Sequence, residues 1–66
     1  MTKEEARSLC SIISVNTDMA YNMEFSTWHQ DYYVTVWKDC LGEVVDVFFC
    51  YSHEDYHRAI KEGQIK

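Results

Sequence analysis

The N-terminal segment has the hydrophobic spacing of an amphipathic helix. Four apolar positions recur at intervals of three and four residues, and they are Ala6, Leu9, Cys10 and Ile13. The run Thr2-Lys3-Glu4-Glu5 has the form of a capping box, and its glutamates suit the positive end of a helix dipole. We therefore expect a helix over about residues 3–15, ended by the turn-forming run Asn16-Thr17-Asp18.

The hydrophobic period becomes two between residues 20 and 28, which predicts a half-buried strand. Tyr21, Met23 and Phe25 alternate there with Asn22, Glu24 and Ser26. The polar run His29-Gln30-Asp31 is the expected turn after this strand.

Residues 32–38 and 43–51 predict a β-hairpin joined by the loop Asp39-Cys40-Leu41-Gly42. A four-residue loop sets a register in which Lys38 faces Glu43, and Val36 faces Val45. One face of the sheet then holds Tyr32, Val34, Val36, Val45, Val47 and Phe49. The other face holds Tyr33, Thr35, Trp37, Val44, Asp46, Phe48 and Cys50, with Glu24 of the first strand beside them.

The C-terminal segment predicts a second helix that begins after Ser52 and ends near Gly63. The whole chain, residues 1–66, is therefore expected to form one small α+β domain with the order α-β-β-β-α. Its centre is a three-stranded antiparallel meander flanked by two terminal helices. The pattern leaves open which face of the sheet these helices cover.

The charge balance is acidic, with 11 Asp and Glu against 6 Lys and Arg. Because binding to a phosphate backbone favours basic proteins, nucleic acid is not expected as a direct partner. A protein with a basic surface, such as a nucleic-acid-binding protein, is the expected partner. The sheet face with Tyr33, Trp37 and Phe48, edged by Asp46 and Glu24, is a candidate interface if the helices cover the other face.

The chain shows no sign of secretion or membrane insertion. Its first residues lack the apolar core of a signal peptide, and no apolar run approaches the ~20 residues of a membrane helix. Its 3 Cys are an odd number, which argues against a fully paired disulfide framework. We therefore expect a cytoplasmic protein.

The segment from Cys50 to His57 gathers one thiol and two imidazoles. His53 and His57 share a helix face at a spacing of four residues, and Cys50 lies just before that helix. Cysteine and histidine are the usual ligands of structural zinc, which takes four of them. Cys10 or His29 is the expected fourth ligand. Cys10 is preferred because it would join the two terminal helices of a chain too short for a large core.

Other interpretations of this segment stay open. In one of them Cys10 and Cys50 are small buried hydrophobic residues and no metal binds. The run His53-Glu54-Asp55-Tyr56-His57 also matches His-Glu-x-x-His, and Cys50 with His57 matches a nucleophile and base, so a small zinc- or cysteine-dependent enzyme is an alternative. A homodimer formed through the aromatic sheet face is another.

In size, acidity and the Cys50/His53/His57 cluster with Cys10, the chain resembles the type II-A anti-CRISPR proteins of bacteriophages, and among them a zinc-containing inhibitor. The resemblance implies a non-catalytic protein that binds the basic recognition lobe of Cas9 and blocks loading of target DNA. It implies zinc held by Cys10, Cys50, His53 and His57. It also implies that the acidic residues that face Cas9 are Glu24, Asp31, Asp46, Glu54 and Asp55.

Overall fold

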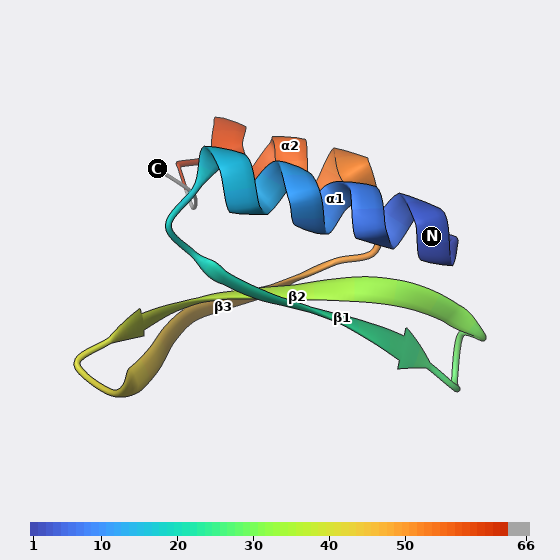
Figure 1. The fold of residues 1–66 in the computed structure, drawn as a ribbon, viewed down its shortest axis with the longest axis horizontal. Coiled ribbons are helices and arrows are strands. Elements are labelled where there is room, and N and C mark those ends of the chain that lie inside the picture. The colour runs from blue at the N-terminus through green and yellow to red at the C-terminus, as the bar shows by residue number, and fades with distance from the viewer. Residues whose placement is uncertain (64–66) are drawn as a thin grey trace.

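The structure, a computed structural model, describes residues 1–63 and confirms the predicted order of elements. These are helix α1 (Lys3–Asn16), strands β1 (Ala20–Ser26), β2 (Asp31–Cys40) and β3 (Glu43–Cys50), and helix α2 (His53–Lys61). The strands form one antiparallel sheet in the order β1-β2-β3. Both helices lie on the same side of this sheet, and no helix of residues 1–63 lies on its other side (Figure 1).

Helix α1 begins as the sequence predicts. The Thr2 hydroxyl accepts a hydrogen bond from the Glu5 amide at 3.2 Å, and the Glu5 carboxylate accepts one from the Thr2 amide at 3.1 Å. The hydrogen bond from the Thr2 amide to the Glu5 carboxylate holds the pKa of Glu5 below its usual value. At the other end, the Thr17 amide and hydroxyl both donate to the Ile13 carbonyl at 2.9 Å, which satisfies an otherwise unpaired carbonyl.

The turn of the β2–β3 hairpin is shorter than predicted. Cys40 pairs with Glu43, so the loop contains only Leu41 and Gly42. Their φ angles are 54° and 85°, and two positive φ values suit the tight hairpin turn whose twist matches that of the strands. Lys38 therefore faces Val45 rather than Glu43.

A β-bulge then shifts the register by one further residue. The irregularity lies opposite the stretch from Val36 to Lys38, and Asp46 there has a φ of 54°. Beyond it Val36 pairs with Phe48 and Thr35 pairs with Phe49. Because side chains alternate across a strand, this shift makes the predicted faces of β3 wrong from Val47 to Cys50, while Val44 and Val45 keep the faces that the sequence predicted. Phe48 lies on the side of the helices, and Phe49 lies on the opposite side.

The core is formed between the helices and the sheet. It is centred on Val34 and Val36 of β2, the middle strand, and both are fully buried. The other buried side chains come from α1, α2 and the end of β3, and they are Ala6, Leu9, Ile13, Cys50, Tyr56 and Ala59. Within residues 1–63 no helix is long and apolar enough to cross a membrane.

We expect Leu9→Ala to lower the free energy of unfolding by about 2–5 kcal/mol, because it leaves a cavity at a fully buried position. The measurement is urea unfolding followed by circular dichroism. Val15→Ala is the control, since Val15 lies on the same helix and is 83% exposed. Similar losses in the two variants would contradict this assignment of the core.

Candidate functional site

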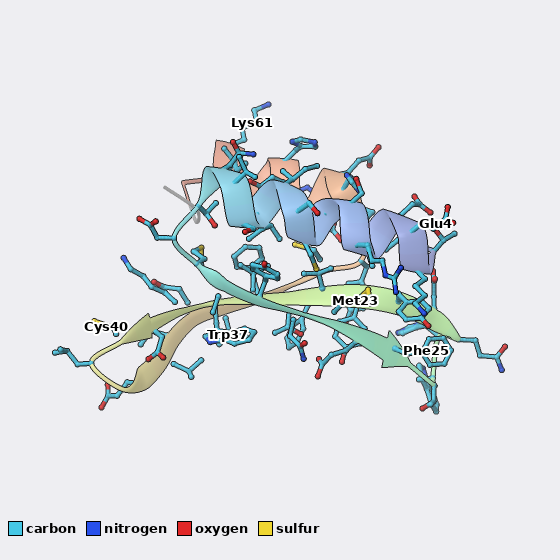
Figure 2. The ribbon with its side chains drawn as sticks, in the orientation of Figure 1. Glu4, Met23, Phe25, Trp37, Cys40 and Lys61 are labelled. Atoms are coloured by element: carbon cyan, nitrogen blue, oxygen red, sulfur yellow. The ribbon has the colours of Figure 1, made fainter. Side chains whose placement is uncertain are left out.

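The side of the sheet away from the helices is an aromatic surface, here called the open face. Pairing places Glu24 beside Tyr33, and Thr35 beside Phe49, while Figure 2 shows Trp37 pointing away from the helices. The open face is formed by the residues that alternate to this side and by the residue that follows β3, namely Asn22, Glu24, Tyr33, Thr35, Trp37, Val44, Val47, Phe49 and Tyr51.

Aromatic rings on the open face pack against one another in a row. The ring centroids of Tyr33 and Tyr51 lie 5.5 Å apart in a stacked arrangement, and those of Tyr33 and Phe49 lie 6.1 Å apart edge to face. His29, in the turn before β2, extends the row with its ring 5.9 Å from that of Tyr51. Phe49 and Tyr51 remain half-exposed, so this row is accessible to a partner.

One carboxylate is held directly on the aromatic surface. The Thr35 hydroxyl donates to Glu24 at 3.0 Å, and Glu24 is the strand partner of Tyr33. The same carboxylate raises the pKa of the Tyr33 hydroxyl. Aromatic faces next to a fixed carboxylate attract guanidinium and ammonium groups. The open face is therefore suited to bind arginine and lysine side chains.

The other predicted acidic residues lie elsewhere. Asp31 binds the Met1 ammonium group at 2.5 Å, and this contact holds the pKa of Asp31 below its usual value. Asp55 accepts a hydrogen bond from the Tyr51 amide at 2.7 Å and so helps to begin α2, which also carries the exposed Glu54. Of the eight residues predicted to bind a partner, the open face brings together Glu24, Tyr33 and Trp37, while Phe48 packs against the core on the side of the helices. The sequence analysis did not predict Phe49 and Tyr51 as part of the interface. The bulge decides which face of the sheet Phe49 lies on, and the sequence pattern does not show this bulge.

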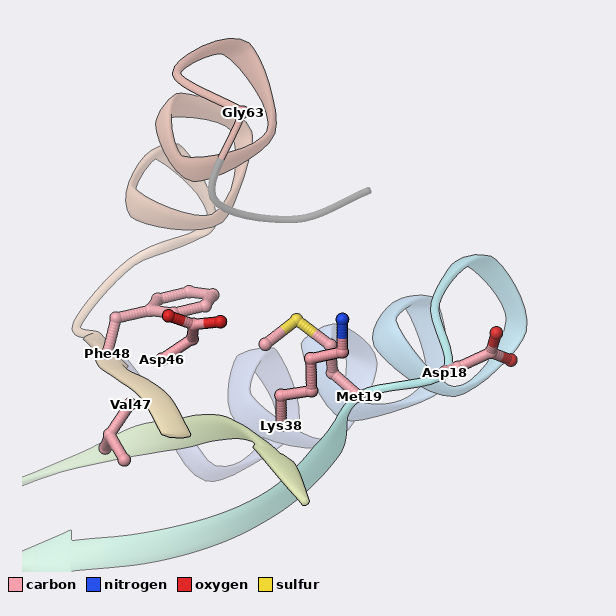
Figure 3. A pocket seen from close by; sticks show the side chains of 7 residues that line it. All are labelled: Asp18, Met19, Lys38, Asp46, Val47, Phe48 and Gly63. Atoms are coloured by element: carbon pink, nitrogen blue, oxygen red, sulfur yellow. The ribbon is translucent and has the colours of Figure 1, made fainter. Parts of the chain in front are cut away.

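Asp46, in the bulge, lines a cavity of about 520 Å³ at the hairpin end of the helix side. Figure 3 shows the side chains of Lys38, Met19 and Phe48 around the same space. The charged residues that line it are Lys38, Asp18 and Asp46. Because both signs are present, the cavity has no clear preference for a charged ligand.

The four predicted zinc ligands occupy different environments. Cys50 is 0% exposed in the core, and burial raises its pKa to about 11. The Nε2 atom of His53 lies 3.0 Å from the Glu5 carbonyl oxygen, while His57 is exposed on α2. Cys10 is partly buried on α1, where burial raises its pKa. Among residues 1–63 no three His, Cys, Asp or Glu side chains form a group that could hold a metal ion.

The zinc assignment stays a prediction, and it expects one metal ion per chain. Native mass spectrometry of untagged protein, before and after acid treatment, measures this directly. Loss of the metal in a Cys50→Ser variant that also melts earlier would support a structural zinc. A metal-free protein with three reactive thiols on denaturation would contradict it.

We expect the three cysteines to differ in reactivity because their burial differs. In metal-free protein at pH 8, iodoacetamide should modify Cys40 first, since it is exposed, and Cys10 more slowly. Cys50 should react only on unfolding, because it is buried and its raised pKa leaves little thiolate. Mass spectrometry of digested protein gives the three rates. Rapid modification of Cys50 in the folded protein would contradict this order.

A comparison with known proteins identifies no relative. No protein-family model, no curated protein and no solved structure matches the chain. The resemblance to type II-A anti-CRISPR proteins therefore stays a prediction. The observation that bears most directly on function is the chemistry of the open face.

Proposed function

We propose that this chain is a non-catalytic binding protein that uses its open face to contact a basic surface of another protein. The observation that carries this proposal is the row of Tyr33, Phe49 and Tyr51 next to the fixed carboxylate of Glu24. Large aromatic side chains supply most of the binding energy at many protein interfaces. Here they lie on a sheet, which holds them in place before the partner arrives.

Charge favours a basic partner over a second copy of the chain. Each chain has a net charge of -5, so pairing two open faces would bring like charges together. A basic surface is instead attracted at long range by the net negative charge of the chain, and at short range it can contact Glu24. Arginine suits both the aromatic row and the Glu24 carboxylate of the open face, because its planar guanidinium stacks on aromatic rings and pairs with carboxylates.

The resemblance to type II-A anti-CRISPR proteins supports Cas9 as the candidate partner. The recognition lobe of such a nuclease is basic because it binds nucleic acid, and an acidic inhibitor would occupy that surface and block the loading of target DNA. This proposal places the protein in the cytoplasm of a bacterial host and gives it no catalytic residue. It does not depend on zinc.

The proposal predicts binding to the complex of a type II-A Cas9 with its guide RNA, together with inhibition of DNA cleavage. Affinity should fall by about tenfold or more between low and high salt, because salt screens the attraction between opposite charges. Glu24→Gln and Phe49→Thr should each weaken binding by about tenfold, which corresponds to about 1.4 kcal/mol. Biolayer interferometry at two salt concentrations measures both effects.

Glu4→Gln is the matched control, because it removes the same charge from α1, on the covered side of the sheet (Figure 2). It should leave affinity within about twofold of the wild-type value. If Glu24→Gln and Phe49→Thr bind like the wild type, the open face is not the interface. If the wild-type protein fails to bind, the proposed function is overturned.

A further inference from the structure

The turn of the β2–β3 hairpin exposes a large apolar side chain at the end of the molecule. Leu41 is fully exposed. The β2–β3 turn that contains it projects beyond the two helices (Figure 1). The turn, Leu41 and Gly42, is here called the hairpin tip. An exposed leucine gains nothing from burial, so the folded chain alone does not explain this choice of residue.

The backbone of Leu41 is unfavourable as well. Its φ angle is 54°, in the left-handed region that disfavours a residue with a branched side chain. Hairpin turns of this kind favour asparagine, aspartate or glycine at the first position. Leucine therefore carries both a conformational and a hydration cost here. A residue that is unfavourable for stability in these two ways indicates a role in binding rather than in folding.

The surroundings of Leu41 indicate the chemistry of its partner. Asp39 and Glu43 flank the hairpin tip, and both are exposed. We propose that Leu41 is an anchor that inserts into an apolar recess ringed by lysine and arginine side chains on the partner protein. This inference rests on the proposed function and names a second contact with the same basic surface.

The hairpin tip and the open face are connected by apolar side chains. Val44 follows the tip on the side of the open face, and Figure 3 shows Val47 pointing away from Phe48, which lies toward α2. Val44 and Val47 are half-exposed, and they lead along β3 to Phe49. One partner surface can therefore cover the open face and receive Leu41 at its end.

The substitution Leu41→Asn separates stability from binding. Asparagine tolerates the left-handed conformation, so the melting temperature should rise by about 4 °C or more. Affinity for the complex of Cas9 with guide RNA should nevertheless fall by at least about tenfold, because the anchor is lost. A variant that is more stable yet binds less well cannot owe its weaker binding to unfolding.

Val15→Asn is the matched control. Val15 is also a highly exposed aliphatic residue, but it lies on α1, on the covered side of the sheet. Its substitution by the same residue should leave affinity within about twofold of the wild-type value. Loss of binding in this variant as well would show that any exposed apolar residue matters, and it would overturn the inference.

Cys40 gives a second measurement in the wild-type protein. It is exposed and directly precedes Leu41, so insertion of the tip should slow its alkylation by iodoacetamide at least about tenfold. The rate at Cys10, on the covered side, should not change. Unchanged alkylation of Cys40 in the complex would contradict insertion of the tip.

The outcomes distinguish this inference from the proposed function. If Leu41→Asn binds like the wild type while Phe49→Thr binds weakly, Leu41 is no anchor and the open face remains the interface. If Phe49→Thr and Leu41→Asn both bind like the wild type, or the wild type does not bind, both proposals are overturned. If both variants bind weakly and the complex slows alkylation of Cys40, the results support both the proposed function and the Leu41 anchor.

Discussion

The structure depends on the burial of one face of its central strand. Val34 and Val36 of β2 lie against Leu9 and Ile13 of α1, and Tyr56 of α2 completes the same core. Both helices of residues 1–63 cover this one side of the sheet. The other side is left to water or to a partner. The placement of both helices on one side therefore creates the core on that side and leaves the open face as the candidate interface.

The exposed side of the sheet is unusual because it is aromatic where a solvated face would be polar. Antiparallel sheets with one covered face normally alternate apolar and polar residues. Here Tyr33, Trp37 and Phe49 occupy positions of the uncovered face. An apolar surface of this kind carries a risk of aggregation, which the net charge of -5 reduces by repulsion between copies. The same charge favours a partner of opposite sign.

In the β2–β3 hairpin, local backbone geometry determines which side chains lie on the open face. Three residues other than glycine have a positive φ within residues 1–63, and two of them, Leu41 and Asp46, belong to this hairpin. The tight turn at Leu41 and the bulge at Asp46 together change the register by an odd number of residues. That change moves Phe48 into contact with the core and leaves Phe49 on the open face.

The sequence by itself determined the elements and their order. The spacing of Leu9 and Ile13, the capping box at Thr2 and the alternation along β1 are local signals, so a single chain displays them directly. They also sufficed to place Glu24, Tyr33 and Trp37 on one face. Only the tertiary structure decided which face the helices cover, the register of β3 and the surroundings of Cys50 and His57. These features depend on one bulge and on packing between distant segments, which no local pattern of residues records.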